Sequence, residues 1–287
     1  MEAKRVRYVS PGVAEVQVHL SSQTNNGLTV QIERTNPKDP VRNLHVVMPG
    51  YENQFLAQPF HPTFLEAMKK YKIIRFMKWM DGDGAGKGDW ASRPTRQSAS
   101  YAWSHLNRPK GASLEDIIFL SNRLGASPWF VLQTSIEDDY VTKFAALVRD
   151  TLRPDVKVYV ELGNEVWSTL HRTGQYAHEQ GLRTGLGPHP YIRLYCETWP
   201  QAAHFLTGLG RCWLVKRTRE IAKIIKSVLV RPRKQLQVVL GTQSGNIDVL
   251  RQLLQCDTGS GGDDIDAVGI APYFNGYATN EQNQILL

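Results

Sequence analysis

The feature that most constrains the fold is an alternation of short apolar runs with longer amphipathic segments from Asn43 onward. Short apolar runs bounded by turn residues are typical of buried strands, and apolar residues at helical spacing are typical of helices. Strands that alternate with helices favour βαβ units and a parallel sheet. Six strands are expected, over residues 44–48, 73–77, 129–132, 156–160, 236–240 and 265–270.

The segments between these runs carry helix signals. One helix is expected around 63–70, and another begins at the capping-box-like Ser113-Leu114-Glu115-Asp116. A third runs from about Asp138 to Leu152, because apolar residues recur there at helical spacing. These residues are Val141, Phe144, Ala145, Val148 and Leu152. The predicted fold class is therefore α/β, of the (β/α)₈ TIM-barrel type.

The predicted barrel is incomplete. Eight strands are needed, and only fourteen residues remain after Tyr273. Either the fold is open or the chain is a fragment. Residues 182–212 lack clean periodicity and are expected to form a long loop with some helix, or an insertion foreign to the fold.

The residues before the barrel form a β-rich segment. Val16, Val18 and Leu20 alternate with polar residues, and Asn25-Asn26-Gly27 predicts a turn. We therefore divide the chain into residues 1–42, the remnant of an accessory β-domain or a small cap, and residues 43–287, a barrel domain.

Composition narrows the classes of partner. A chain of 287 residues suits one large α/β domain. The net charge of +7 comes from scattered Lys and Arg, which argues against nucleic-acid binding. No apolar stretch is long enough for a membrane span, and no apolar region follows the N-terminal basic residues as a signal peptide would require. A monomer without a membrane partner is expected, and its localisation stays open.

No cofactor or metal is expected. The glycine-rich residues 82–88 lack the spacing of a phosphate loop, and the histidines and carboxylates form no metal-ligand pattern. The three cysteines show no Cys-x-x-Cys spacing, so their redox state stays open. They are Cys196, Cys212 and Cys256.

One pair of residues has the chemistry for glycosidic cleavage. Asn164 and Glu165 follow the expected fourth strand, and the open face of a barrel lies at the carboxyl ends of its strands. A carboxylic acid there can protonate a leaving oxygen, and the amide can bond a sugar hydroxyl. The spacing fits equally well a first-turn carboxylate of the next helix.

The segment Val158-Tyr159-Val160-Glu161-Leu162-Gly163-Asn164-Glu165-Val166-Trp167 resembles the Asn-Glu motif that ends strand four in a large clan of retaining (β/α)₈ glycoside hydrolases, which includes cellulases and mannanases. The resemblance implies that Glu165 is the acid/base and that Asn164 binds the sugar 2-hydroxyl. Residues 113–167 also resemble proteins often labelled cellulose-binding. The resemblance spans about 41–273, weakens over 182–212, and implies secretion of a full-length protein.

Further positions enter through the same resemblance. Arg75 resembles the arginine beneath the clan's nucleophile, and Tyr273 the aromatic residue that bonds the nucleophile. A surface ion pair and a packed core ring are the alternatives. Five tryptophans and four charged residues lie where rings could stack on sugars and charges could bond hydroxyls. They are Trp79, Trp90, Trp103, Trp129 and Trp167, with Asp81, Asp83, Asp89 and Arg93.

The second carboxylate of a retaining mechanism is missing from the predicted barrel. The clan takes it from strand seven, and the only carboxylate after Tyr273 is Glu281, which follows no strand. The expected function is that of a glycoside hydrolase acting on a β-linked polysaccharide or oligosaccharide, through a retaining mechanism with Glu165 as acid/base. The alternatives are a non-catalytic carbohydrate-binding protein and an inactive fragment.

Overall fold

The computed structural model describes residues 3–10, 13–18, 32–48, 50–84, 86, 88–98, 101, 111–186, 208–256 and 264–270. Contacts divide the chain into two compact units, residues 1–59 and residues 60–287. The division falls after the boundary predicted at residue 42, because the segment that follows Asn43 does not enter the parallel sheet. The origin of the N-terminal segment stays a prediction.

The first unit contains an antiparallel hairpin. Strand β1 (Ala3–Ser10) pairs with β2 (Val13–Val18), with Ala3 opposite Val18 and Ser10 opposite Val13. The predicted turn at 25–27 lies outside the described residues.

The prediction of a first barrel strand over 44–48 is wrong. These residues form no strand, and the side chains of Leu44, Val46 and Met48 are 61%, 78% and 60% exposed. A strand is stabilised by a neighbour that satisfies its backbone N–H and C=O groups, and no such partner for this segment occurs among the described residues. Apolar residues alone did not identify a strand here.

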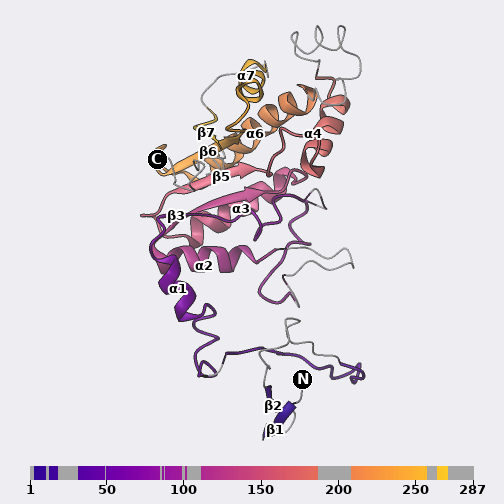
Figure 1. Ribbon diagram of the computed structural model, residues 1–287, viewed down its shortest axis with the longest axis vertical. Helices are drawn as coiled ribbons and strands as arrows, with labels where there is room; N and C mark the ends of the chain where they lie inside the picture. The colour runs from indigo at the N-terminus through magenta and orange to yellow at the C-terminus, as the bar shows by residue number, and fades with distance from the viewer. Residues whose placement is uncertain are drawn as a thin grey trace, which may run out of the picture. The chain divides into compact units, whose positions relative to one another are not determined.

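The second unit is built on a curled, five-stranded parallel sheet, a half-barrel in the order β3-β4-β5-β6-β7 (Figure 1). The predictions of an α/β fold and of five of the six strands are confirmed, with boundaries shifted by up to two residues. The strands are β3 (Ile73–Arg75), β4 (Ser127–Leu132), β5 (Val158–Leu162), β6 (Leu236–Gly241) and β7 (Ala267–Gly269).

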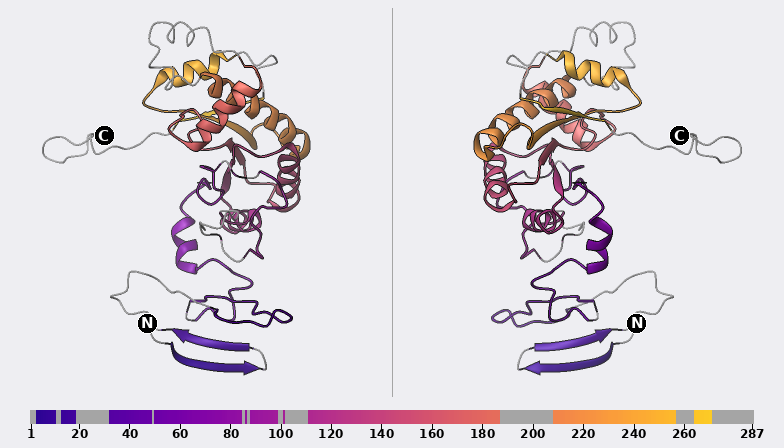
Figure 2. Two further views of the ribbon diagram at one scale, coloured as in Figure 1. Left: turned by 90° about the vertical axis from the view of Figure 1, so that its right-hand side faces the viewer. Right: turned by 90° about the vertical axis from the view of Figure 1, so that its left-hand side faces the viewer.

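Six helices occur in the described part of this unit. They are α1 (Pro62–Met68), α2 (Leu114–Leu124), α3 (Asp138–Thr151), α4 (Arg172–Arg183), α6 (Gly208–Leu229) and α7 (Ile247–Gln255). Helices α3 and α6 cover one face of the sheet (Figure 2). Of the predicted loop at 182–212, the first residues end α4 and residues 208–212 begin α6; residues 187–207 lie outside the described chain.

Two sequence signals explain why these helices form where they do. Ser113 accepts a hydrogen bond from the Asp116 backbone N–H (3.1 Å), which confirms the predicted cap of α2. Gly125 ends α2 with φ 61°, a left-handed conformation that glycine adopts without steric cost. All five apolar residues predicted for the inner face of 138–152 are buried, at 0–4% exposure.

The alternation along β5 separates core from site. Val158, Val160 and Leu162 are buried in the core between the sheet and its helices. The period of two sends Tyr159 and Glu161 to the opposite, inner face of the curl. Glu161 is only 5% exposed, so this face carries a buried charge.

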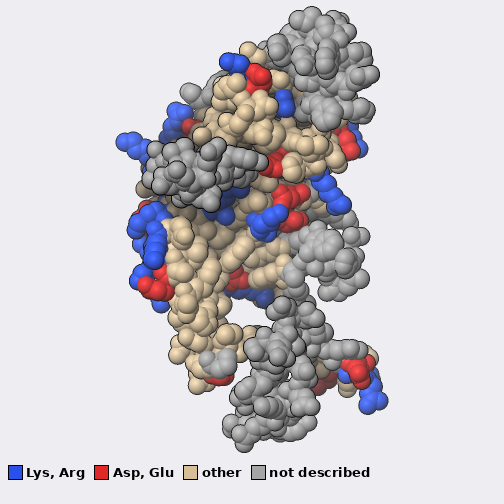
Figure 3. All heavy atoms as spheres, in the orientation of Figure 1, with Lys and Arg blue, Asp and Glu red and all other residues tan. Residues whose placement is uncertain are grey.

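No helix in the described residues is both long enough and apolar enough to cross a membrane. Acidic and basic side chains lie interspersed on the face shown in Figure 3.

Candidate functional site

A bidentate ion pair lies on the inner face of the half-barrel. Arg75, the last residue of β3, donates from Nε to Glu161 Oε2 and from Nη2 to Glu161 Oε1, each at 2.9 Å. Strand β4 separates β3 from β5, and the guanidinium carbon lies 5.6 Å from the ring centre of Trp129 on β4. The pair therefore ties three strands together.

Asn164 extends this pair into a polar network. Arg75 Nη2 also donates to Asn164 Oδ1 (3.1 Å), and Asn164 Nδ2 donates to Asp83 Oδ1 (2.8 Å). Asp83 in turn forms an ion pair with Lys78. The amide of Asn164 is thus held from both ends, with its oxygen toward a cation and its nitrogen toward a carboxylate.

Charge pairing shifts the protonation of this network. Burial alone would raise the pKa of Asp83, but the hydrogen bonds from Lys78 and Asn164 and the Lys78 charge lower it below its ordinary value. The same hydrogen bond and charge of Asp83 raise the pKa of Lys78. Both groups stay ionised at neutral pH.

Glu165 occupies a strained turn directly after this network. Its φ of 52° places a residue with a Cβ in the left-handed region, which costs roughly 1–2 kcal/mol. Gly163 before it has φ 63°, and a Cβ there would meet Val166 Cγ2 at 2.5 Å. The Asn164 N–H bonds the Gly82 carbonyl at 2.8 Å. Packing on both sides imposes the turn, and the strain at Glu165 is retained.

The alternative assignment of Glu165 to a helix start is wrong. Helix α4 begins at Arg172, and its N-cap is His171. The Glu165 side chain is 27% exposed, and its Oε2 lies 2.5 Å from His171 Nε2. An accessible carboxylate beside an imidazole can exchange a proton with a bound ligand.

The structure gives the other predicted residues different surroundings. Trp79 is half-buried among Phe60, Phe64 and Phe76, with ring centres 5.6–6.5 Å apart. Trp167 is half-buried against the core. The contacts of Trp79 are those of a core ring. Tyr273 and Trp103 lie outside the described residues, so their roles stay predictions.

The loop after Asp81 is held by packing and ion pairs. A Cβ on Gly82 would meet Val131 Cγ1 at 2.7 Å, and one on Gly88 would clash with the Ser135 carbonyl oxygen. Arg93 stacks on Trp90 at 4.3 Å and pairs with Glu115. The glycines of this loop therefore allow its backbone to approach the end of β4 closely. Arg93 is held by its contacts with Trp90 and Glu115.

Sequence reasoning gave no role to Glu161, Lys78 or His171. Glu161 carried a usable signal, because it is the one charged residue within the apolar strand Val158–Leu162 and has the alternation of an inward position. The pairings of Lys78 and His171 depend on loop geometry. Among the described residues, no group of three or more His, Cys, Asp or Glu side chains could hold a metal ion.

Comparison with known proteins found no match to a family, to a curated protein or to a solved structure.

Proposed function

We propose that the carboxyl end of the half-barrel acts on the O-glycosidic bonds of a β-linked oligosaccharide or polysaccharide, with Glu165 as acid/base. The observation that carries the proposal is the conformation of Glu165: an accessible carboxylate is kept in a left-handed turn that glycine would occupy without strain. Strain of this kind concentrates at functional sites. The resemblance of residues 158–167 to a glycoside hydrolase motif supports the same role.

The residues around Glu165 suit a sugar ligand. Within the described part of the chain, the Asn164 amide donates one hydrogen to Asp83, which leaves its second hydrogen for a hydroxyl oxygen. His171 Nε2 lies beside the carboxylate of Glu165, and Lys78 is near enough for the Glu165 charge to contribute to its raised pKa. The carboxylic acid form of Glu165 would protonate the leaving oxygen, and the carboxylate would accept the proton of the attacking water.

A second candidate is binding without turnover. The two other carboxylates of the polar network, Asp83 and Glu161, are both engaged in ion pairs, and Glu161 is 5% exposed. A retaining reaction needs a second carboxylate ~5–5.5 Å from the first to attack the sugar. The engagement of both groups favours an oligosaccharide-binding protein as the alternative.

Hydrolysis and binding measured on the same variants separate these functions. The wild type, Glu165→Gln and Glu179→Gln are compared on aryl β-glycosides and soluble β-glucans; Glu179 is an exposed carboxylate on α4 and serves as the matched control. Loss of a general acid lowers turnover by about 10²–10⁴-fold. We expect that loss only in Glu165→Gln. Binding without turnover by the wild type supports the second candidate, and neither binding nor turnover by a cooperatively melting protein refutes both.

A further inference from the structure

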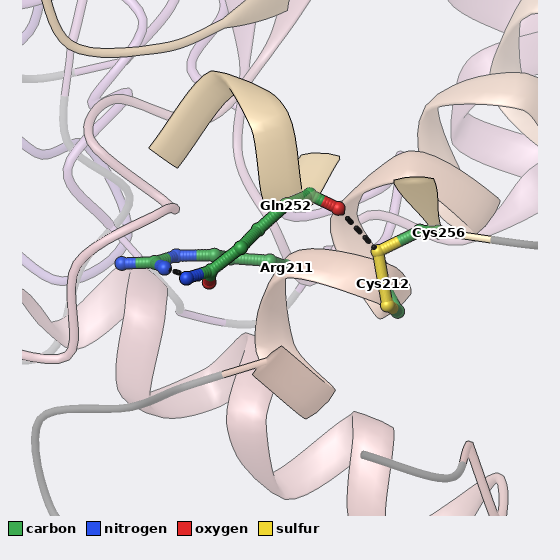
Figure 4. Close-up of a disulfide and its surroundings, with 4 residues drawn as sticks. All are labelled: Arg211, Cys212, Gln252 and Cys256. Atoms are coloured by element: carbon green, nitrogen blue, oxygen red, sulfur yellow. Dashed lines mark hydrogen bonds between the residues drawn. A yellow bond between two sulfur atoms is a disulfide. The ribbon is translucent and has the colours of Figure 1, made fainter. Parts of the chain in front are cut away.

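A buried arginine reaches the Glu165 turn from the far side. Arg211 lies in the first turn of α6 and is 9% exposed. Its Nε donates to the Trp167 carbonyl oxygen (3.2 Å), and its Nη1 bonds the side chain of Gln252 on α7 (Figure 4). Burial lowers the pKa of Arg211. Among the described residues no carboxylate pairs with it, and its two partners there, the Trp167 carbonyl and the Gln252 amide, are neutral.

A buried guanidinium with neutral partners is costly to maintain. Packing alone therefore does not account for a charged side chain at this position. The group it holds, the Trp167 carbonyl, lies two residues after Glu165.

The Trp167 carbonyl lies at the middle of a closed loop. The Ser168 N–H bonds the Glu165 carbonyl (3.0 Å), and the His171 N–H bonds the Ser168 carbonyl (3.2 Å). The side chains of Glu165 and His171 then meet at the loop's two ends. A displacement of the Trp167 carbonyl would move both members of this pair.

A disulfide fixes the two helices that aim Arg211. Cys212, the next residue on α6, is bonded to Cys256, the C-cap of α7, with Cα atoms 5.1 Å apart. Both cysteines are buried. Gln252 lies one helical turn before Cys256, so the disulfide and the Arg211–Gln252 contact join α6 to α7 at neighbouring points (Figure 4).

We propose that Arg211 is a positioning residue for Glu165, acting through the Trp167 carbonyl, and that the Cys212–Cys256 disulfide holds α6 and α7 in the arrangement that aims it. The effect of Arg211 on hydrolysis rests on the proposed function of Glu165. The claim that Arg211 and the disulfide hold the loop in place does not depend on that function.

Amide hydrogen exchange measured by mass spectrometry tests whether Arg211 holds the loop between Glu165 and His171 in place. Arg211→Met is compared with Arg231→Met, whose guanidinium likewise donates to backbone carbonyls, those of Leu152, Arg153 and Val156, but near the amino end of β5. We expect the Ser168 and His171 amides to exchange about ten-fold faster in Arg211→Met, the effect of losing one charged hydrogen bond. Amides of β4 should keep their rates in both variants.

The disulfide is tested by the same readout. The double variant Cys212→Ala/Cys256→Ala should also speed exchange at Ser168 and His171.

Two further variants test Arg211 itself. Arg211→Lys keeps one donor and should restore part of the protection that Arg211→Met loses. Where Arg211→Met does not fold, Gln252→Leu removes the side chain that anchors Arg211 and leaves the guanidinium. Unchanged exchange in the loop, or equal loosening by Arg231→Met, would overturn the proposal.

Kinetics then tests the functional part. Misplacing a catalytic group by about 1 Å costs on the order of 10²-fold in rate. Arg211→Met should therefore lower kcat strongly and leave KM within about two-fold, whereas Arg231→Met should change neither. A wild type that hydrolyses no glycoside refutes the proposed function, and the exchange experiment still decides the role of Arg211.

Discussion

Removing Arg75 should destabilise the second unit more than any surface substitution, because it strips a buried carboxylate of its cation. Glu161 is 5% exposed and accepts two hydrogen bonds from Arg75, both at 2.9 Å. Breaking a buried pair on one side costs about 3–5 kcal/mol. The Arg75 side chain is 33% exposed, so in the variant water partly replaces the guanidinium as a partner of Glu161. We therefore take about 3 kcal/mol, the lower end of this range, as the expected loss of stability for Arg75→Met.

The double variant Arg75→Met/Glu161→Met isolates this cause. It removes both charges and fills the same space with apolar groups, which is often neutral for stability. We expect it to recover most of the loss, giving a coupling energy of about 2 kcal/mol.

Urea unfolding at pH 7, followed by circular dichroism and tryptophan fluorescence, measures these free energies. A loss of about 3 kcal/mol corresponds to a fall in Tm of roughly 6–12 °C for a domain of this size. A loss below about 1 kcal/mol for Arg75→Met, or a double variant whose loss is the sum of the two single losses, would refute the reasoning.

Three further predictions concern the turn, the disulfide and the carboxylate network. Glu165→Gly should raise the free energy of unfolding by about 1 kcal/mol, because it relieves the backbone at φ 52°, and should abolish turnover; unfolding curves that match those of Glu165→Gln contradict this. Cys212→Ala/Cys256→Ala should cost about 4 kcal/mol by the loop-entropy relation for a 44-residue separation, and an unchanged Tm counts against it. The lowered pKa of Asp83 means that its contribution is fully present above its unfolded pKa and is lost as pH falls through the folded value. Below about pH 4, Asp83→Asn should therefore lose less stability than the wild type, and parallel acid-unfolding curves would contradict that sign.

The elements that sequence patterns predicted well are those whose partners lie close in the chain. The cap Ser113–Asp116 and the buried face of α3 each depend on residues within a few positions, and both were found where expected. The run at 44–48 has the same apolar character as β4 but does not enter the parallel sheet, because strand formation needs a partner that composition does not specify.

The residues of the candidate site likewise differ in how far away in the chain their partners lie. Asn164 and Glu165 were identified from a local motif. The partner of Arg75 could not be predicted from the sequence, because Glu161 is 86 residues away and the two side chains meet across β4. Cys212 and Cys256 pair only because α6 and α7 pack together, and the spacing of cysteines alone left the redox state open.

The most direct test of the central claim compares good and poor leaving groups. A general acid matters most when the departing oxygen is basic, and matters little when an activated aryl oxygen leaves without a proton. We expect Glu165→Gln to lower kcat/KM by about 10²–10⁴-fold on an alkyl β-glycoside or β-linked oligosaccharide and far less on a dinitrophenyl β-glycoside. Equal losses on both substrates, or full activity of the variant on the oligosaccharide, would contradict it.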